Sequence, residues 1–335
     1  MRSALITGLA GDRLSADEKS FLAGTKPAGI ILFARNCQSS DQIKTLVADA
    51  VAAIGADDVL VLIDQEGGRV QRIRPPLGRA LPPARAFGAL YTDDPELAIS
   101  AARHVFQLLA NDLRALGINT DCAPVLDIPV PGADGIIGDR AYGDTAQPII
   151  ALGRAVAEGL MDGGVVPVIK HIPGHGRATC DSHLALPVVG EAAGVLNETD
   201  FEPFRALADL PSAMTAHVVY SAIDNEAPAT TSRIVIEGVI RGHIGFGGLL
   251  MSDDLSMKAL RGPMRERAES CISAGCDLAL HCNGEMEEML AVAEGVPELA
   301  GASLQRFQAA WNITQKQGTV DVAEAESALE KLLLG

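Results

Sequence analysis

The amino-acid sequence predicts an α/β fold of the (β/α)8 TIM-barrel type, formed as a single domain over residues 1–335. Short apolar segments recur along the chain, and a stretch with helical character follows each of them. These segments are nearly continuous in apolar residues rather than alternating, which is typical of parallel strands covered on both faces. The composition agrees, because a chain of this length with 48% apolar residues can bury a large core.

Eight segments are predicted to be the barrel strands, at residues 4–9, 29–33, 59–63, 120–123, 165–169, 212–215, 248–251 and 277–281. Helices are predicted between them, at residues 15–22, 40–54, 95–116, 148–162, 198–207, 233–241 and 265–274. Ser15 followed by Glu18 is a capping-box pattern, and Pro95 stands where a first helical turn begins. After the last strand, residues 284–294, 303–316 and 323–333 are predicted to be helices that pack on the barrel.

Charge and cysteine content exclude some classes of function. The formal net charge is −16 and the Lys and Arg residues are scattered, which argues against a nucleic-acid partner. The six cysteines form no CxxC pair or regular framework, as expected for reduced thiols in the cytosol. The N-terminal apolar run is too short for a signal peptide or a membrane span, and Asp12 and Arg13 follow it. We therefore expect a soluble cytoplasmic protein without a membrane partner.

The most informative stretch of the chain follows the fifth predicted strand. It contains Lys170, His171, His175, Asp181 and His183 within fourteen residues. The glycines and the proline between them argue against regular structure, so the stretch is predicted to be a loop. Loops held by a rigid scaffold commonly carry catalytic residues, and we therefore expect an active-site loop here.

Polar residues also follow other predicted strands, among them Asp64, Asp127, His217 and Asp253. Active sites of such barrels lie at the carboxyl ends of the strands, so these side chains are expected to converge on one face. Carboxylates, imidazoles and fixed cations without a Gly-rich phosphate loop fit glycoside hydrolysis. That reaction needs one group to trap the oxocarbenium ion and another to protonate the leaving oxygen. The residues alone therefore favour a carbohydrate-active barrel.

Other interpretations of the same residues remain open at this point. Lys170 at a strand end could form a Schiff base, which would make the protein an aldolase. His171 and His175, with Asp181 and His183, are spaced as metal ligands could be, which would make it a metal-dependent hydrolase. A sugar-binding barrel without turnover is a third alternative. We expect neither a cofactor nor a metal.

Two carboxylates have simple structural interpretations. Asp254 is expected to cap or support the turn after the seventh strand, a role that is equally open to Asp253 from its position alone. Glu66 is expected to accept hydrogen bonds from the backbone amides around Gly67 and Gly68.

Several segments resemble the bacterial β-N-acetylhexosaminidases of glycoside hydrolase family 3, exo-enzymes of cell-wall recycling. They are residues 29–36, 63–72, 123–127, 138–143, 169–176 with 181–183, and 252–257, and they occur in order over most of the chain. One departure is visible, because Ile172 stands where the family usually has Phe. We expect that residue to pack against its neighbours rather than to contact substrate.

The resemblance implies a retaining exo-β-N-acetylglucosaminidase that acts on muropeptides of the GlcNAc-1,6-anhydroMurNAc type. It implies that Asp253 is the nucleophile, that His183 is the general acid/base and that Asp181 pairs with His183. It also implies a set of ligands for the terminal N-acetylglucosamine, namely Asp64, Arg72, Arg140, Lys170 and His171. A histidine titrates near pH 6.5 and can therefore serve as acid and base around neutrality. Because a neutral histidine repels phosphate less than a carboxylate does, a β-N-acetylglucosaminide phosphorylase remains an alternative.

Overall fold

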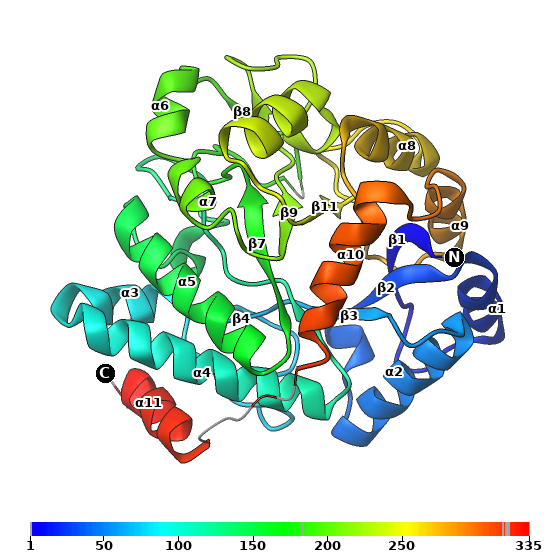
Figure 1. Ribbon diagram of the computed structural model, residues 1–335, viewed down its shortest axis with the longest axis horizontal. Helices are drawn as coiled ribbons and strands as arrows, with labels where there is room; N and C mark the ends of the chain where they lie inside the picture. Colours follow the sequence, from blue (N-terminus) through cyan, green and yellow to red (C-terminus); the bar gives the residue numbers. More distant parts are fainter. Residues whose placement is uncertain (1, 183, 317, 319–321, 335) are drawn as a thin grey trace.

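The computed structural model describes residues 2–182, 184–316, 318 and 322–334, and within them eight parallel strands form a closed barrel (Figure 1). The strands are β1 (Ser3–Gly8), β2 (Pro27–Leu32), β3 (Leu60–Ile63), β6 (Thr120–Asp121), β7 (Val166–Ile172), β9 (Ser212–Thr215), β11 (Leu249–Asp254) and β12 (Leu278–His281). Each pairs with the next in chain order, and β12 closes on β1. The predicted fold class is confirmed, and each predicted strand segment overlaps one of these strands.

Helices surround the barrel, as Figure 1 shows. They are α1 (Ala16–Thr25), α2 (Ser40–Ile54), α3 (Ala84–Asp93), α4 (Pro95–Ala115), α5 (Ala146–Asp162), α6 (Ala193–Glu198), α7 (Glu202–Ala206), the π-type helix η4 (Ile234–His243), α8 (Met264–Ala274), α9 (Met286–Glu294), α10 (Gly301–Ile313) and α11 (Val322–Leu334). The capping box at the start of α1 is present, because Ser15 Oγ accepts from the Glu18 amide and the Glu18 carboxylate accepts from the Ser15 amide.

Two helix predictions were incomplete or wrong. The segment predicted as one helix at residues 198–207 is divided between α6 and α7, because Thr199 ends the first and Pro203 stands in the first turn of the second. Helix α3 was not predicted, since it is short and contains Gly88. That glycine permits a close approach, because a Cβ there would lie 1.8 Å from the Tyr142 carbonyl oxygen.

The amino-terminal end of the barrel is closed by α10, which crosses the strands in Figure 1. Phe307 and Ala310 of this helix are buried against the apolar side chains that fill the barrel. Asp277, which directly precedes β12, accepts from Ser303 Oγ at 2.6 Å and from Arg306 Nη1 at 2.9 Å. Because this end is closed, access to the barrel interior is from the carboxyl ends of the strands.

Two small sheets lie beyond the barrel strands. Strands β4 (Gln65–Gly67) and β5 (Val70–Gln71) form a hairpin after β3, and β8 (Val188–Val189) pairs with β10 (Val219–Tyr220). The Gln65 side chain fixes the hairpin, because it accepts from the amides of Arg72 and Ile73 and donates to the Ile73 carbonyl. Among the described helices, none is long and apolar enough to cross a membrane.

Candidate active site

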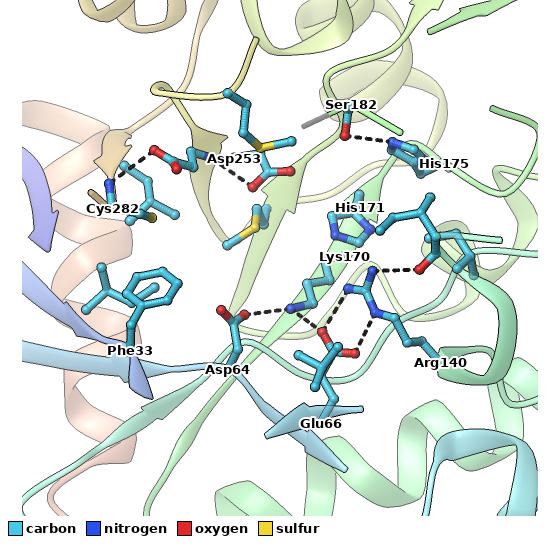
Figure 2. Close-up of a pocket in the computed structure, with 18 of the residues that line it drawn as sticks. Phe33, Asp64, Glu66, Arg140, Lys170, His171, His175, Ser182, Asp253 and Cys282 are labelled. Atoms are coloured by element: carbon cyan, nitrogen blue, oxygen red, sulfur yellow. Dashed lines mark hydrogen bonds and ion pairs between the residues drawn. The ribbon is translucent and has the colours of Figure 1, made fainter. Parts of the chain in front are cut away.

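A cavity of about 240 Å³ opens at the carboxyl end of the barrel (Figure 2). Six residues that the sequence predicted for the site line it, namely Asp64, Arg72, Arg140, Lys170, His171 and Asp253. Asp64, Lys170, His171 and Asp253 follow or end barrel strands, and the structure brings them together as the strand positions predicted, whereas Asp127 and His217 do not line the cavity. Asp181 is not among the lining residues, although Ser182 beside it is. The predicted acid/base, His183, lies outside the residues that the structure describes.

One wall of the cavity is a chain of alternating charges centred on Lys170. The Lys170 Nζ atom lies 2.9 Å from Asp64 Oδ1 and 2.6 Å from Glu66 Oε1. Arg72 donates to the other Asp64 oxygen at 2.7 Å, and Arg140 donates to both Glu66 oxygens at 2.8 Å. Three cations thus share two carboxylates in a largely buried cluster. Glu66 was expected to accept from backbone amides, and that expectation was wrong, because both its oxygens face side-chain cations.

The charges of this cluster hold one another in the ionised state. Burial alone would raise the pKa of the Glu66 carboxyl, but Arg140 and Lys170 lower it to about 2. Burial likewise opposes the charge of Asp64, yet Lys170 and Arg72 hold its pKa well below the usual range. Burial would lower the pKa of Lys170, whereas Asp64 and Glu66 raise it above its ordinary value. Because a Schiff-base lysine must lose its proton before it attacks, this environment argues against the aldolase alternative.

Beside this cluster, Asp127 connects the loop after β6 to the loop after β7. Its fully buried carboxylate accepts from His171 Nδ1 at 2.7 Å and from the His175 amide at 2.6 Å. The His175 ring packs edge-on against the His171 ring, and its Nε2 atom lies 3.2 Å from Ser182 Oγ. Burial, with His171 nearby, lowers the pKa of His175 to about 4, so His175 is neutral at physiological pH. Because the Nδ1 atom of His171 contacts Asp127, this histidine presents its Nε2 side to the cavity that it lines.

Asp253 stands across the cavity from the charged cluster, as Figure 2 shows. Its Oδ1 atom accepts from the Asp254 amide at 2.8 Å. The neighbouring Asp254 carboxylate accepts from Ser256 Oγ at 2.6 Å, from the Ser256 amide and from the Cys282 amide. Asp254 thus supports the turn after β11, as expected from the sequence, and both Asp253 and Asp254 line the cavity.

Two histidines at strand ends do not join the site. His217 is fully buried and lies 2.7 Å from Thr230 Oγ1 and 3.0 Å from the Asp254 carbonyl oxygen, so it braces the start of the turn after β11. His281 is also fully buried, and its Nε2 atom lies 3.1 Å from Glu288. Strand position alone could not distinguish these supporting side chains from those that face the cavity.

Apolar side chains form much of the remaining wall, and sequence reasoning missed them. They include Phe33, Met214, Met257, Leu280 and Cys282. The Phe33 ring lies between two guanidinium groups, with the Cζ atoms of Arg35 and Arg72 each 4.9 Å from its centroid. Phe33 directly follows β2, so the rule that located the polar residues would have found it had apolar types been considered.

Of the four candidate ligands in the metal-dependent alternative, His183 lies outside the described residues. Among those residues, no group of three or more His, Cys, Asp or Glu side chains gathers as metal ligands would. The Nδ1 atom of His171 is engaged by Asp127.

Comparisons with known proteins identify the family of the chain. Residues 4–312 match the model of the glycosyl hydrolase family 3 N-terminal domain. The chain is 42% identical to a β-hexosaminidase of Alkalilimnicola ehrlichii, over 88% of this chain and 84% of that protein. It is similar to the crystal structure of NagZ from Neisseria gonorrhoeae in complex with N-trifluoroacetyl-D-glucosamine, with a TM-score of 0.88, 34% identity and coverage of 99% and 98% of the two chains. A family 3 β-N-acetylglucosaminidase from Paenibacillus sp. has a TM-score of 0.87 at 32% identity, covering 98% of this chain and 66% of that one.

Proposed function

The chain belongs to glycosyl hydrolase family 3 and is a glycoside hydrolase of the β-N-acetylhexosaminidase type, and from this premise we propose that it is a retaining exo-β-N-acetylglucosaminidase. Its substrates are peptidoglycan-derived muropeptides that carry a terminal N-acetylglucosamine on 1,6-anhydro-N-acetylmuramic acid. It acts in the cytoplasm during peptidoglycan recycling, and residues 1–335 work as one catalytic domain with the C-terminal helices packed on it.

The observation that carries the proposal is the arrangement of Asp253 opposite the charged cluster. The cavity volume of about 240 Å³ lies just below the roughly 300–1,000 Å³ of drug-sized ligand sites, which suits a single sugar ring. Hydroxyl groups of that ring bind the donors and acceptors of Asp64, Arg72, Arg140, Lys170 and His171. This orientation directs the anomeric carbon toward Asp253, and a pocket for one ring fits release of a terminal sugar.

The reaction then follows the retaining course of two displacements. Asp253 attacks the anomeric carbon and forms a covalent glycosyl ester while His183 gives its proton to the departing glycosidic oxygen. His183 next takes a proton from water, which attacks the same carbon and releases Asp253. Asp181 orients His183 and stabilises its imidazolium form, as the carboxylate does in a catalytic triad. The position of Ser182 on the cavity wall supports this assignment, because Ser182 separates the two residues.

The first test is phenol release from an aryl β-N-acetylglucosaminide and from the matching aryl β-glucoside. We expect turnover of the N-acetyl substrate alone, and no turnover by Asp253→Ala. Azide added to that variant should restore a product, a glycosyl azide of inverted configuration, because a small nucleophile enters the vacated space. Inverted sugar released by the wild-type enzyme would refute the retaining mechanism. A rate that requires phosphate, with a sugar 1-phosphate as product, would instead establish the phosphorylase.

The role of His183 is tested by comparing two leaving groups. A general acid contributes about 10²–10⁴-fold, so His183→Ala should lose about that much on a muropeptide. The loss should be much smaller on an aryl glycoside whose leaving group needs no protonation. Equal losses on the two substrates would contradict the acid role, and His243→Ala, at an exposed histidine outside the cavity, serves as the matched control.

A further inference from the structure

We propose that Asp127 is a positioning residue that fixes the tautomer of His171 and so makes the His171 Nε2 atom a hydrogen-bond acceptor for a sugar hydroxyl. The inference rests on the proposed function to the extent that it takes His171 as a ligand of the sugar. Asp127 itself is fully buried and does not line the cavity. Its effect on the sugar is therefore exerted through His171, whose ring it contacts.

The two carboxylate oxygens of Asp127 share the backbone amide of His171, which lies 3.3 Å from Oδ2, but they differ in their other partners. Oδ1 accepts from the backbone amide of His175 at 2.6 Å and from that of His171 at 3.2 Å. Oδ2 lies 2.7 Å from the His171 Nδ1 atom. A carboxylate is held ionised here because, although burial opposes its charge, the hydrogen bonds from the His171 ring and the His175 backbone amide lower the pKa of Asp127. An ionised carboxylate only accepts, so the proton of a neutral His171 ring resides on Nδ1 and Nε2 carries the lone pair.

An acceptor at this point complements the rest of the wall. Lys170, Arg72 and Arg140 only donate, and the two carboxylates Asp64 and Glu66 are shared among these three cations. A sugar hydroxyl both donates and accepts, so each hydroxyl that accepts from a cation needs an acceptor for its own proton. A neutral His171 supplies one without adding a fourth positive charge to the cluster.

The geometry predicts what an amide would do at position 127. Backbone amides only donate, so the amide oxygen of Asp127→Asn must stay at the Oδ1 position, where it faces the amides of His171 and His175. The amide nitrogen then occupies the Oδ2 position and donates to His171 Nδ1. The ring must change tautomer, its proton moves to Nε2, and the atom facing the cavity becomes a donor. This isosteric substitution therefore reverses the polarity of the ligand while it keeps the packing.

Asp121→Asn is the matched control, because it makes the same change at a fully buried carboxyl only six residues away. Asp121 Oδ1 accepts from the Gln65 amide at 3.0 Å, and an amide oxygen can replace it. Its Oδ2 atom has no hydrogen-bond partner among the described residues. Burial raises the pKa of Asp121 to about 8, so the acid is already uncharged at neutral pH.

The experiment combines nitrogen-15 NMR of the histidine rings with kinetics on the aryl β-N-acetylglucosaminide. The His171 signals are assigned with His171→Gln. We expect protonated Nδ1 and unprotonated Nε2 in the wild-type protein and in Asp121→Asn, and the reverse in Asp127→Asn. The value of kcat/KM should fall about 10- to 100-fold in Asp127→Asn, mainly through KM, and stay within about twofold in Asp121→Asn. Asp127→Asn should add no further loss in the His171→Ala background.

Three results would overturn the inference. They are an unprotonated Nδ1 atom in the wild-type protein, an undiminished kcat/KM in Asp127→Asn, and a full additional loss when that change is made in His171→Ala. The wild-type spectrum decides the tautomer even if the Asp127→Asn protein does not fold. The two proposals are tested by separate measurements. Failure of the wild-type enzyme to cleave the aryl substrate would refute the proposed function, whereas the tautomer of His171 could still be measured in the spectrum.

Discussion

Replacing Lys170 by methionine is the sharpest test of the charged cluster, since methionine keeps the aliphatic stem and removes the ammonium group. Lys170 is nearly inaccessible, with 2% of its surface exposed, and it contacts both carboxylates of the cluster. Its loss leaves Asp64 with Arg72 and Glu66 with Arg140, and it removes the cation between the two anions.

The size of the effect follows from these contacts. Removing one partner of a buried ion pair destabilises a protein by about 3–5 kcal/mol. Each carboxylate keeps one arginine, so we expect Lys170→Met to lower the free energy of unfolding at pH 7 by about 3 kcal/mol, near the lower limit. The deficit should shrink on acidification. A carboxyl whose pKa is lowered by folding stabilises the protein at pH values above its pKa in the unfolded chain, which is about 4.5 for Glu66. That stability is lost as the pH falls toward the pKa in the folded protein, which is about 2. The variant has less of this stability to lose.

The assay is urea unfolding of the wild-type protein and the variant at pH 7 and pH 3.5, with Lys258→Met as the control at an exposed lysine. The control should match the wild-type protein within about 0.5 kcal/mol. A Lys170→Met deficit that is the same at both pH values would refute the electrostatic reasoning and attribute the loss to packing alone.

Three further predictions concern single buried groups. Because the pKa of His175 is lowered to about 4, the free energy of unfolding should fall by up to about 3 kcal/mol as the pH falls from 6.5 to 4. In urea unfolding at several pH values, His175→Asn should make this dependence on pH flatter. Because the pKa of Asp121 is raised to about 8, the wild-type protein loses stability as the pH rises. Between pH 5 and pH 8, the free energy of unfolding of Asp121→Asn should rise by up to about 4 kcal/mol relative to that of the wild-type protein. Parallel curves of this free energy against pH would contradict the prediction. A Cβ at Gly176 would lie 1.9 Å from the Ile128 carbonyl oxygen, so Gly176→Ala should lower the thermal midpoint by several degrees, whereas Gly194→Ala, with open space around it, should leave the midpoint unchanged.

Much of the fold was predictable because most barrel strands contain a short apolar run. The buried pattern of β3 and β7 is continuous, and such runs are visible in the sequence without knowledge of their partners. The strands β4, β5, β8 and β10 have two or three residues each, which is too short for a periodic pattern. Their positions depend on contacts such as the Gln65 side chain with the hairpin.

The same distinction applies to the site. Asp64, Lys170, His171 and Asp253 follow or end barrel strands, so the position of the strand predicts the position of the side chain. Arg140 lies on the long segment between β6 and α5 rather than at a strand end. Its pairing with Glu66, 74 positions earlier, arises when the barrel closes, so no local pattern contains it.

The closure of the barrel by α10 bears on the order in which the protein can mature during its synthesis. Strand β1 is made first but pairs with β12, and the helix that seals the amino-terminal end follows β12. A nascent chain that has not yet emerged past residue 313 exposes the apolar side chains against which Phe307 packs, and before β12 emerges it also has two unpaired strand edges. Such edges recruit other chains, so translation pauses before this point should promote aggregation, and chaperone contacts on the ribosome should persist until α10 is released.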